Sequence, residues 1–146
     1  METKVIYFGV FIHDEYSKLA ILKLLQDNNI RIPKEWKKYI HHMTIAFNNG
    51  SPEFDILYNM YKDDFGKNVK LEIDGIGVSE DAIAVRVNWK YPIVNKIPHI
   101  TVATPPDGKP VNSNKIIGWQ GLKEPITIYG NTAQTGLSSV QCARTA

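Results

Sequence analysis

The sequence contains very little of several features that define large protein classes. It has one cysteine, Cys142, in 146 residues, so it cannot form an internal disulfide, and its fold does not depend on an oxidising compartment. A lone thiol near the end of the chain is also a poor candidate for a nucleophile. The net charge is only +2, which gives no strong field for binding duplex nucleic acid. A small anionic ligand remains compatible, because a local cluster of hydrogen-bond donors is enough to bind it.

Long apolar segments are also scarce. The apolar run over residues 5–12 is too short to span a bilayer, and no small-residue cleavage site follows it. We therefore expect a soluble cytoplasmic protein that does not bind membranes, located in the host cytoplasm if its source is viral. The chain has 43% apolar and 22% charged residues, which is ordinary for a globular protein, and no low-complexity linker divides it. We expect a single domain over residues 1–146 and a monomer.

Hydrophobic periodicity predicts a mixed α+β fold. We expect strands over residues 5–12, 42–47, 69–78, 82–89, 99–103 and 126–129, and helices over residues 14–28, 51–66 and 112–119. The third and fourth strands are expected to form a hairpin, and residues 130–146 an irregular tail. Asp14 is a suitable N-cap for the first helix. The expected apolar face of that helix consists of Leu19, Leu22, Leu24 and Leu25.

Two copies of one short motif stand out. His42-Met43-Thr44 and His99-Ile100-Thr101 share the order His-apolar-Thr-apolar-Ala. Composition predicts about 0.2 His-x-Thr triplets by chance, so a matched pair is a strong signal. On a strand, the imidazole and the hydroxyl of each motif point to the same face, about 6.6 Å apart along the backbone. The repeat suggests a pseudo-symmetric fold with two lobes.

The chemistry of the motif favours phosphodiester cleavage. Two such strands side by side would place two imidazoles and two hydroxyls around one small volume. Cleavage needs a base for the attacking oxygen, an acid for the leaving oxygen, and donors for the non-bridging oxygens. Histidine suits both proton transfers, because its unperturbed pKa is about 6.5. We expect a phosphodiesterase that uses no metal and no cofactor, with four catalytic residues: His42, Thr44, His99 and Thr101.

Other interpretations of the histidines remain open. Each could be a structural side chain held by one hydrogen bond, and the threonines could merely favour strands. A structural zinc site is disfavoured, because the sequence has no His-x-x-x-His pair and no pair of cysteines. We expect His41 to point to the opposite face of its strand as a non-catalytic neighbour, and His13 to lie at a strand end.

Weaker candidates for substrate binding come from several segments. Tyr7 could stack a base, although buried packing is the alternative. Lys96 and Lys109 could neutralise phosphate. Asn112-Ser113-Asn114, at the expected start of a helix, offers amides and a hydroxyl to an anion or a base edge. Trp119 could contact the ligand or pack in the core.

The paired motifs resemble those of the 2H phosphoesterase superfamily. Residues 95–103, Asn-Lys-Ile-Pro-His-Ile-Thr-Val-Ala, and residues 108–114 resemble two of its branches. One branch is the anti-CBASS nucleases of phages, which degrade cyclic oligonucleotide second messengers. The other is the cyclic-phosphodiesterase domain of fungal tRNA ligases. The resemblance covers residues 5–129 and implies a LigT-like fold with two pseudo-symmetric lobes, whose antiparallel sheets line a central cleft.

The resemblance also carries expectations about function. It implies that His42 and His99 are the acid–base pair and that Thr44 and Thr101 hold the phosphate. The small size and the lack of ligase or kinase modules favour the phage-type branch. That branch implies immune evasion through cleavage of 3′–5′ linkages in small cyclic di- or trinucleotides, by 2′-hydroxyl attack through a 2′,3′-cyclic phosphate. The alternatives are an enzyme that opens 2′,3′-cyclic phosphates or joins 2′–5′ ends of RNA, and a non-catalytic nucleotide-binding module.

Overall fold

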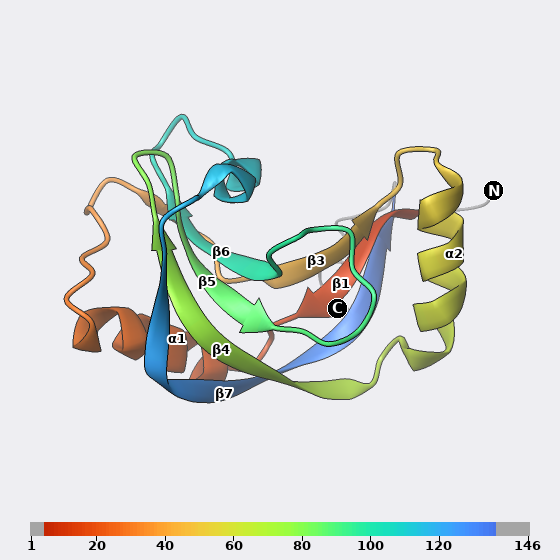
Figure 1. Cartoon of the computed structure of the whole chain (residues 1–146), viewed down its shortest axis with the longest axis horizontal. Helices are drawn as coiled ribbons and strands as arrows, with labels where there is room; N and C mark the ends of the chain where they lie inside the picture. Colours follow the sequence, from red (N-terminus) through yellow and green to blue (C-terminus); the bar gives the residue numbers. More distant parts are fainter. Residues whose placement is uncertain (1–4, 137–146) are drawn as a thin grey trace.

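The computed structural model describes residues 5–136 (Figure 1). The expected irregular segment over residues 137–146, with Cys142, lies outside the described residues. Within the described part, the elements follow in the order β1 (Val5–Phe11), α1 (Glu15–Asp27), β2 (Lys37–Lys38), β3 (His42–Phe47), α2 (Pro52–Tyr61), the 3-10 turn η1 (Lys62–Asp64), β4 (Asn68–Val78), β5 (Ile83–Asn88), β6 (His99–Thr104), the 3-10 turn η2 (Pro110–Lys115) and β7 (Trp119–Gly136).

The strands form one antiparallel sheet that closes on itself. Their order is β2-β6-β3-β1-β7-β4-β5, and an additional pairing of β6 with β5 joins the two sides. Six strands thus make a barrel-like ring, while the short β2 extends the pairing of β6. The mixed α+β class and the antiparallel pairing are confirmed. The described residues have one continuous sheet.

Apolar side chains on one face of this sheet make the core. They alternate along the strands, as side chains with a period of two must. The largest fully buried ones include Phe8, Val10, Met43, Ile45, Leu71, Ile73, Ile100 and Ile128. The two helices lie at opposite ends of the sheet in Figure 1. Burial of each large side chain contributes about 1.5–3 kcal/mol, so the strand pattern fixes which face points inward.

The first helix begins where the sequence predicts, but it is rotated. Asp14 accepts a hydrogen bond from the Tyr16 amide and is the N-cap. Leu19, expected on the apolar face, is 59% exposed, and Ile21 is fully buried in its place. The cause is Ser17, whose hydroxyl donates to Asp14 at 2.8 Å and accepts from the backbone amide of Tyr129 at 3.1 Å. These bonds tie α1 to β7 and turn the Ser17 side of the helix inward.

The C-terminal part differs most from expectation. The predicted helix over residues 112–119 is absent; η2 occupies its first half and β7 begins at Trp119. The predicted irregular structure from residue 130 is also wrong, because β7 continues to Gly136. This strand pairs with β1 on one side and β4 on the other, so its backbone is satisfied in spite of its polar composition. Thr132 and Thr135 are almost fully buried there. Within residues 5–136, no helix is long and apolar enough to cross a membrane.

Gly9 allows β1 to approach the first motif strand closely. The register between β1 and β3 shifts between Phe8 and Gly9, and Gly9 lies opposite Thr44. A Cβ atom at Gly9 would collide with the Met43 carbonyl and lie 3.1 Å from the Thr44 Cα. The obstacle is backbone, which cannot move aside without displacing β3. Only glycine therefore fits at this position.

We predict that Gly9→Ala lowers the free energy of unfolding by about 1–3 kcal/mol or more, the usual cost of overpacking a core. Urea denaturation at neutral pH measures it. Gly118→Ala is the matched control, because a Cβ at Gly118 meets nothing within 4 Å and the backbone there is unstrained for alanine. Equal free energies of unfolding for the two variants would contradict this prediction, because they would mean that β3 can move away from a Cβ at position 9 without loss of stability.

Candidate active site

The two His-x-Thr motifs meet at their middle residues. Strand β3 pairs antiparallel with β6 at Met43 and Ile100, and each is the central residue of its motif. Both side chains are fully buried in the core, so their neighbours along the strands point to the other face. The two imidazoles and two hydroxyls therefore flank one bridge on the face away from the core.

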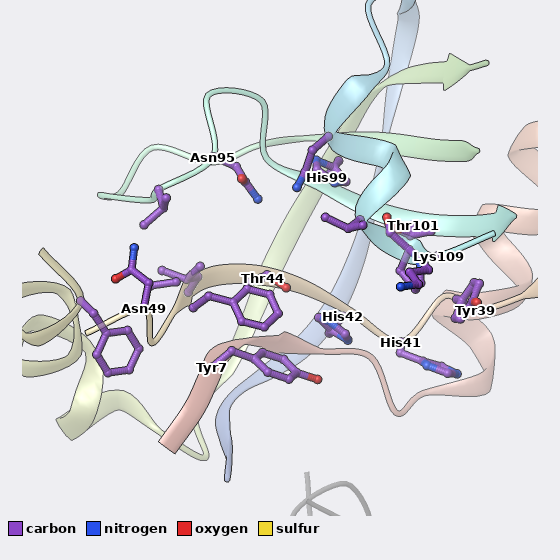
Figure 2. A pocket seen from close by; sticks show the side chains of 18 of the residues that line it. Tyr7, Tyr39, His41, His42, Thr44, Asn49, Asn95, His99, Thr101 and Lys109 are labelled. Carbon is purple, nitrogen blue, oxygen red and sulfur yellow. The ribbon is translucent and has the colours of Figure 1, made fainter. Parts of the chain in front are cut away.

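That face opens into a cavity of about 580 Å³. All four motif residues line it, as Figure 2 shows. The strands supply the floor, and the segment from Lys109 to Asn114, the loop at Asn95 and the beginning of α2 supply the walls. Its volume is in the range of known small-molecule sites. The sequence-predicted catalytic residues are thus brought together in one place.

His42 is packed against two aromatic side chains. Its ring packs against Tyr7 at 5.0 Å and Phe11 at 5.1 Å between ring centroids. Burial, with repulsion from His41 and His99, lowers the pKa of His42 from 6.5 to about 4. The imidazole is therefore neutral at neutral pH in the empty cavity, and one ring nitrogen has a free lone pair.

His99 is held differently. Its Nδ1–H donates to the Ile97 carbonyl at 2.7 Å, which leaves Nε2 as the free ring nitrogen. Burial lowers the pKa of His99, and the Ile97 carbonyl opposes that shift by stabilising the charged ring. The Trp119 ring lies 6.1 Å from the imidazole. His99 is thus better prepared than His42 to take up a proton.

The two threonines also differ. The Thr101 hydroxyl lies 2.8 Å from the Ser113 hydroxyl and donates to the Pro110 carbonyl at 3.3 Å. Ser113 is buried, so η2 fixes the orientation of this side chain. The Thr44 hydroxyl makes no hydrogen bond to any residue within 5–136, and Thr44 lines the cavity. Thr44 therefore keeps its proton available for a ligand.

His41 corrects an expectation from the sequence. It lines the same cavity as His42, instead of pointing to the opposite face. The Ile40 amide donates to the carbonyl of Thr101 on β6, and the next pairing with β6 joins Met43 to Ile100. Between these two pairings β6 advances by one residue and the other segment by three, so two extra residues protrude from the ladder. Ile40 has a φ of 57°, a costly conformation for a β-branched residue. Simple alternation fails here because His41 and His42 form the protrusion.

The structure separates the predicted substrate-binding residues into two groups. Tyr7, Lys109 and Asn114 line the cavity, whereas Lys96, Asn112, Ser113 and Trp119 do not. Two of the second group still touch the motifs, because Ser113 bonds Thr101 and Trp119 packs near His99. Asn112 lies inside η2 and caps no helix, so the helix start on which the expected anion site depended is absent.

The sequence did not indicate several residues of the cavity wall. Tyr39, Asn49, Asn95 and Glu53 all line it. Asn49 belongs to a segment that reads as a turn, and it does form one, because its side-chain oxygen accepts from the Ser51 amide at 3.0 Å. The other three come from loops and a helix start, where no periodic pattern marks a function. In the described part of the chain, no group of three His, Cys, Asp or Glu side chains is arranged to hold a metal ion.

Comparison with known proteins gives the class of this protein and then its family. The model of one phosphodiesterase family, of the 2H phosphoesterase type, matches residues 5–142 and so contains both motifs. The chain belongs to that family, the fungal tRNA ligase phosphodiesterase domain. No curated protein matches the chain.

The buried, neutral His42 predicts an acid-sensitive fold. Between pH 6.5 and 4 the unfolded chain binds a proton at this residue that the folded chain does not, so the free energy of unfolding should fall as pH drops through that range. The loss is at most about 3 kcal/mol. Urea titrations at several pH values should show a shallower fall for His42→Asn than for wild type. Burial and Lys18 also lower the pKa of the exposed His13, but without a shift as large as that of His42, so His13→Asn should flatten the slope less. A wild-type slope in His42→Asn would contradict the burial argument.

Proposed function

We propose that this protein is a 2′,3′-cyclic phosphodiesterase that opens the cyclic phosphate of a nucleotide with two histidines. The observation that supports it is the pairing of the two motifs at Met43 and Ile100, which collects two imidazoles and two hydroxyls in one cavity. Membership of a phosphodiesterase family supports the same reaction class. A purely structural role for the histidines is disfavoured, because both line a cavity instead of packing in the core.

The environments of the histidines favour distinct roles. His42, neutral and packed against Tyr7 and Phe11, has the free lone pair that a general base needs to take a proton from an attacking water. A bound anionic phosphate favours protonation of a neighbouring imidazole. His99 is the better recipient, since the Ile97 carbonyl stabilises its charged form. We assign His99 as the acid that protonates the departing ribose oxygen.

The hydroxyls would hold the non-bridging oxygens. Thr44 has its proton free, so it can donate to the phosphate without breaking an internal bond. Thr101 is positioned by Ser113 and Pro110 before the ligand arrives, and it can donate to phosphate once its proton turns away from the 3.3 Å bond to the Pro110 carbonyl. Such donors stabilise charge that develops on phosphorus-bound oxygens in the transition state. The site therefore contains a base, an acid and two donors from its own side chains.

We predict that wild type hydrolyses a nucleoside 2′,3′-cyclic phosphate in EDTA, because two imidazoles supply both proton transfers. His42→Ala and His99→Ala should each lower kcat by at least about 100-fold, the usual worth of one acid–base group. Thr44→Ala and Thr101→Ala should lower kcat by a smaller factor, since each removes a single hydrogen bond to the phosphate. Liquid chromatography of the released nucleoside monophosphate measures the rate.

The matched control is His13→Ala, which removes an imidazole that is exposed and does not line the cavity. It should keep the wild-type kcat. Loss of activity in EDTA with rescue by a divalent cation would rule out the two-histidine mechanism.

A second candidate function is cleavage of 3′–5′ linkages in cyclic oligonucleotide messengers. The cavity volume of about 580 Å³ favours it, because a single cyclic phosphate needs less room. The same residues would serve: one histidine would deprotonate the substrate's 2′-hydroxyl, and the other would protonate the departing 5′-oxygen. Such an activity would fit a phage protein that evades immunity in the host cytoplasm.

We predict for this candidate that a cyclic dinucleotide is cleaved through a 2′,3′-cyclic phosphate, and that its 2′-deoxy analogue binds but resists cleavage. The reason is that the substrate's own 2′-hydroxyl lies next to the scissile phosphate, so the two imidazoles would need only to transfer protons. Mass spectrometry of early time points detects the cyclic intermediate. Efficient cleavage of the deoxy analogue, or products with a 5′-phosphate, would exclude attack by the 2′-hydroxyl.

A further inference from the structure

The two ends of the cavity differ in chemistry. Beyond Thr101, one end is lined by Tyr39, His41 and Lys109, which lie together in Figure 2. The opposite end contains the carboxamides of Asn49 and Asn95. We call the first of these the cationic end.

Positive charge gathers at the cationic end without a neutralising partner. Lys37 on β2 places its ammonium 5.5 Å from the centre of the Tyr39 ring. Burial, and then the nearby positive charges of Lys18 and Lys37, lower the pKa of His41. Within residues 5–136, neither these lysines nor Lys109 takes part in an ion pair. Lysine ammonium groups that lack a counter-charge favour an anion beside them, and a neutral His41 ring can donate a hydrogen bond to it.

Backbone bonds hold the cationic end in place. The Tyr39 amide donates to Val102 at 2.7 Å, and the Ile12 amide donates to the His41 carbonyl at 2.8 Å. The protrusion that carries His41 is thus fixed on both sides. Lys109 immediately precedes η2, which is attached to the motif strand through Ser113 and Thr101. The cationic end is therefore continuous with the place where the reacting phosphate would be held.

We propose that the cationic end is a second anion site, which binds a phosphate group other than the one that reacts. The proposal rests on the proposed function and narrows its substrate class. Substrates would be nucleotides that carry at least two phosphates, such as a chain end with a 2′,3′-cyclic phosphate and a further phosphate one linkage away. A nucleoside with a single cyclic phosphate would leave Tyr39, His41 and Lys109 without a ligand.

Binding of product-like ligands tests the second site without relying on turnover. Isothermal titration calorimetry would compare a nucleoside 3′-monophosphate with the 3′,5′-bisphosphate of the same nucleoside. The bisphosphate should bind wild type at least about tenfold more tightly, because one charge-assisted hydrogen bond is worth roughly that factor. Equal affinities, or no measurable binding of the bisphosphate, would overturn the proposal.

Two neighbouring lysines provide a matched pair of variants. Lys37 and Tyr39 share a face of their extended segment, whereas Lys38 points the other way. Lys37→Met and His41→Gln should each reduce the preference for the bisphosphate by several-fold. Lys38→Met changes the net charge by the same amount and should keep the preference. A loss as large in Lys38→Met as in Lys37→Met would mean that only overall charge matters, and it would overturn the site.

Failure of the second site can be told apart from failure of the proposed function. Hydrolysis of a nucleoside 2′,3′-cyclic phosphate tests the reaction and needs no second phosphate. The bisphosphate titration tests the cationic end and needs no reaction. Turnover together with equal affinities would retain the proposed function and reject the second site. Tighter binding of the bisphosphate without any turnover would retain the second site and reject the proposed function.

Discussion

The site depends on a single bridge between the middle residues of two motifs. Because Met43 and Ile100 are fully buried in the core, the hydrophobic effect fixes which way their strand neighbours face. The same burial brings together two strands that are far apart in the sequence. The arrangement of the candidate site is therefore a consequence of core packing, because the buried side chains determine where the two imidazoles and two hydroxyls lie.

Antiparallel pairing at that bridge relates the two motifs by a local two-fold axis, and the surroundings then break the symmetry. One imidazole is packed between aromatic rings, while the other donates to a backbone carbonyl. One threonine is bonded to a buried serine, and its counterpart keeps its proton free. The different environments therefore give the histidines and threonines of two similar motifs unequal properties, as a pair of one base and one acid requires.

Much of the fold could be predicted from the sequence, because core strands and helix caps are local patterns. The strands around Phe8, Met43 and Ile100 follow apolar periodicity, and Asp14 caps α1 as expected. The errors arose where contacts between distant segments outweigh local pattern. Ser17 turns α1 through a bond to β7, and β7 is a strand because β1 and β4 flank it on both sides. His41 was misplaced because no sequence pattern marks two residues that protrude from a ladder beside a strained Ile40.

The length of β7 has a consequence for the order in which the protein can fold during synthesis. Both β1, which supports His42, and β4 have an open edge until the residues from Trp119 to Gly136 have left the ribosome. Open strand edges pair readily with other chains. A nascent chain that already contains both motifs thus still presents two unsatisfied edges, and its ring closes only when the last strand inserts between them. The strand that carries neither motif is thus the one whose arrival closes the ring around which the cavity is built.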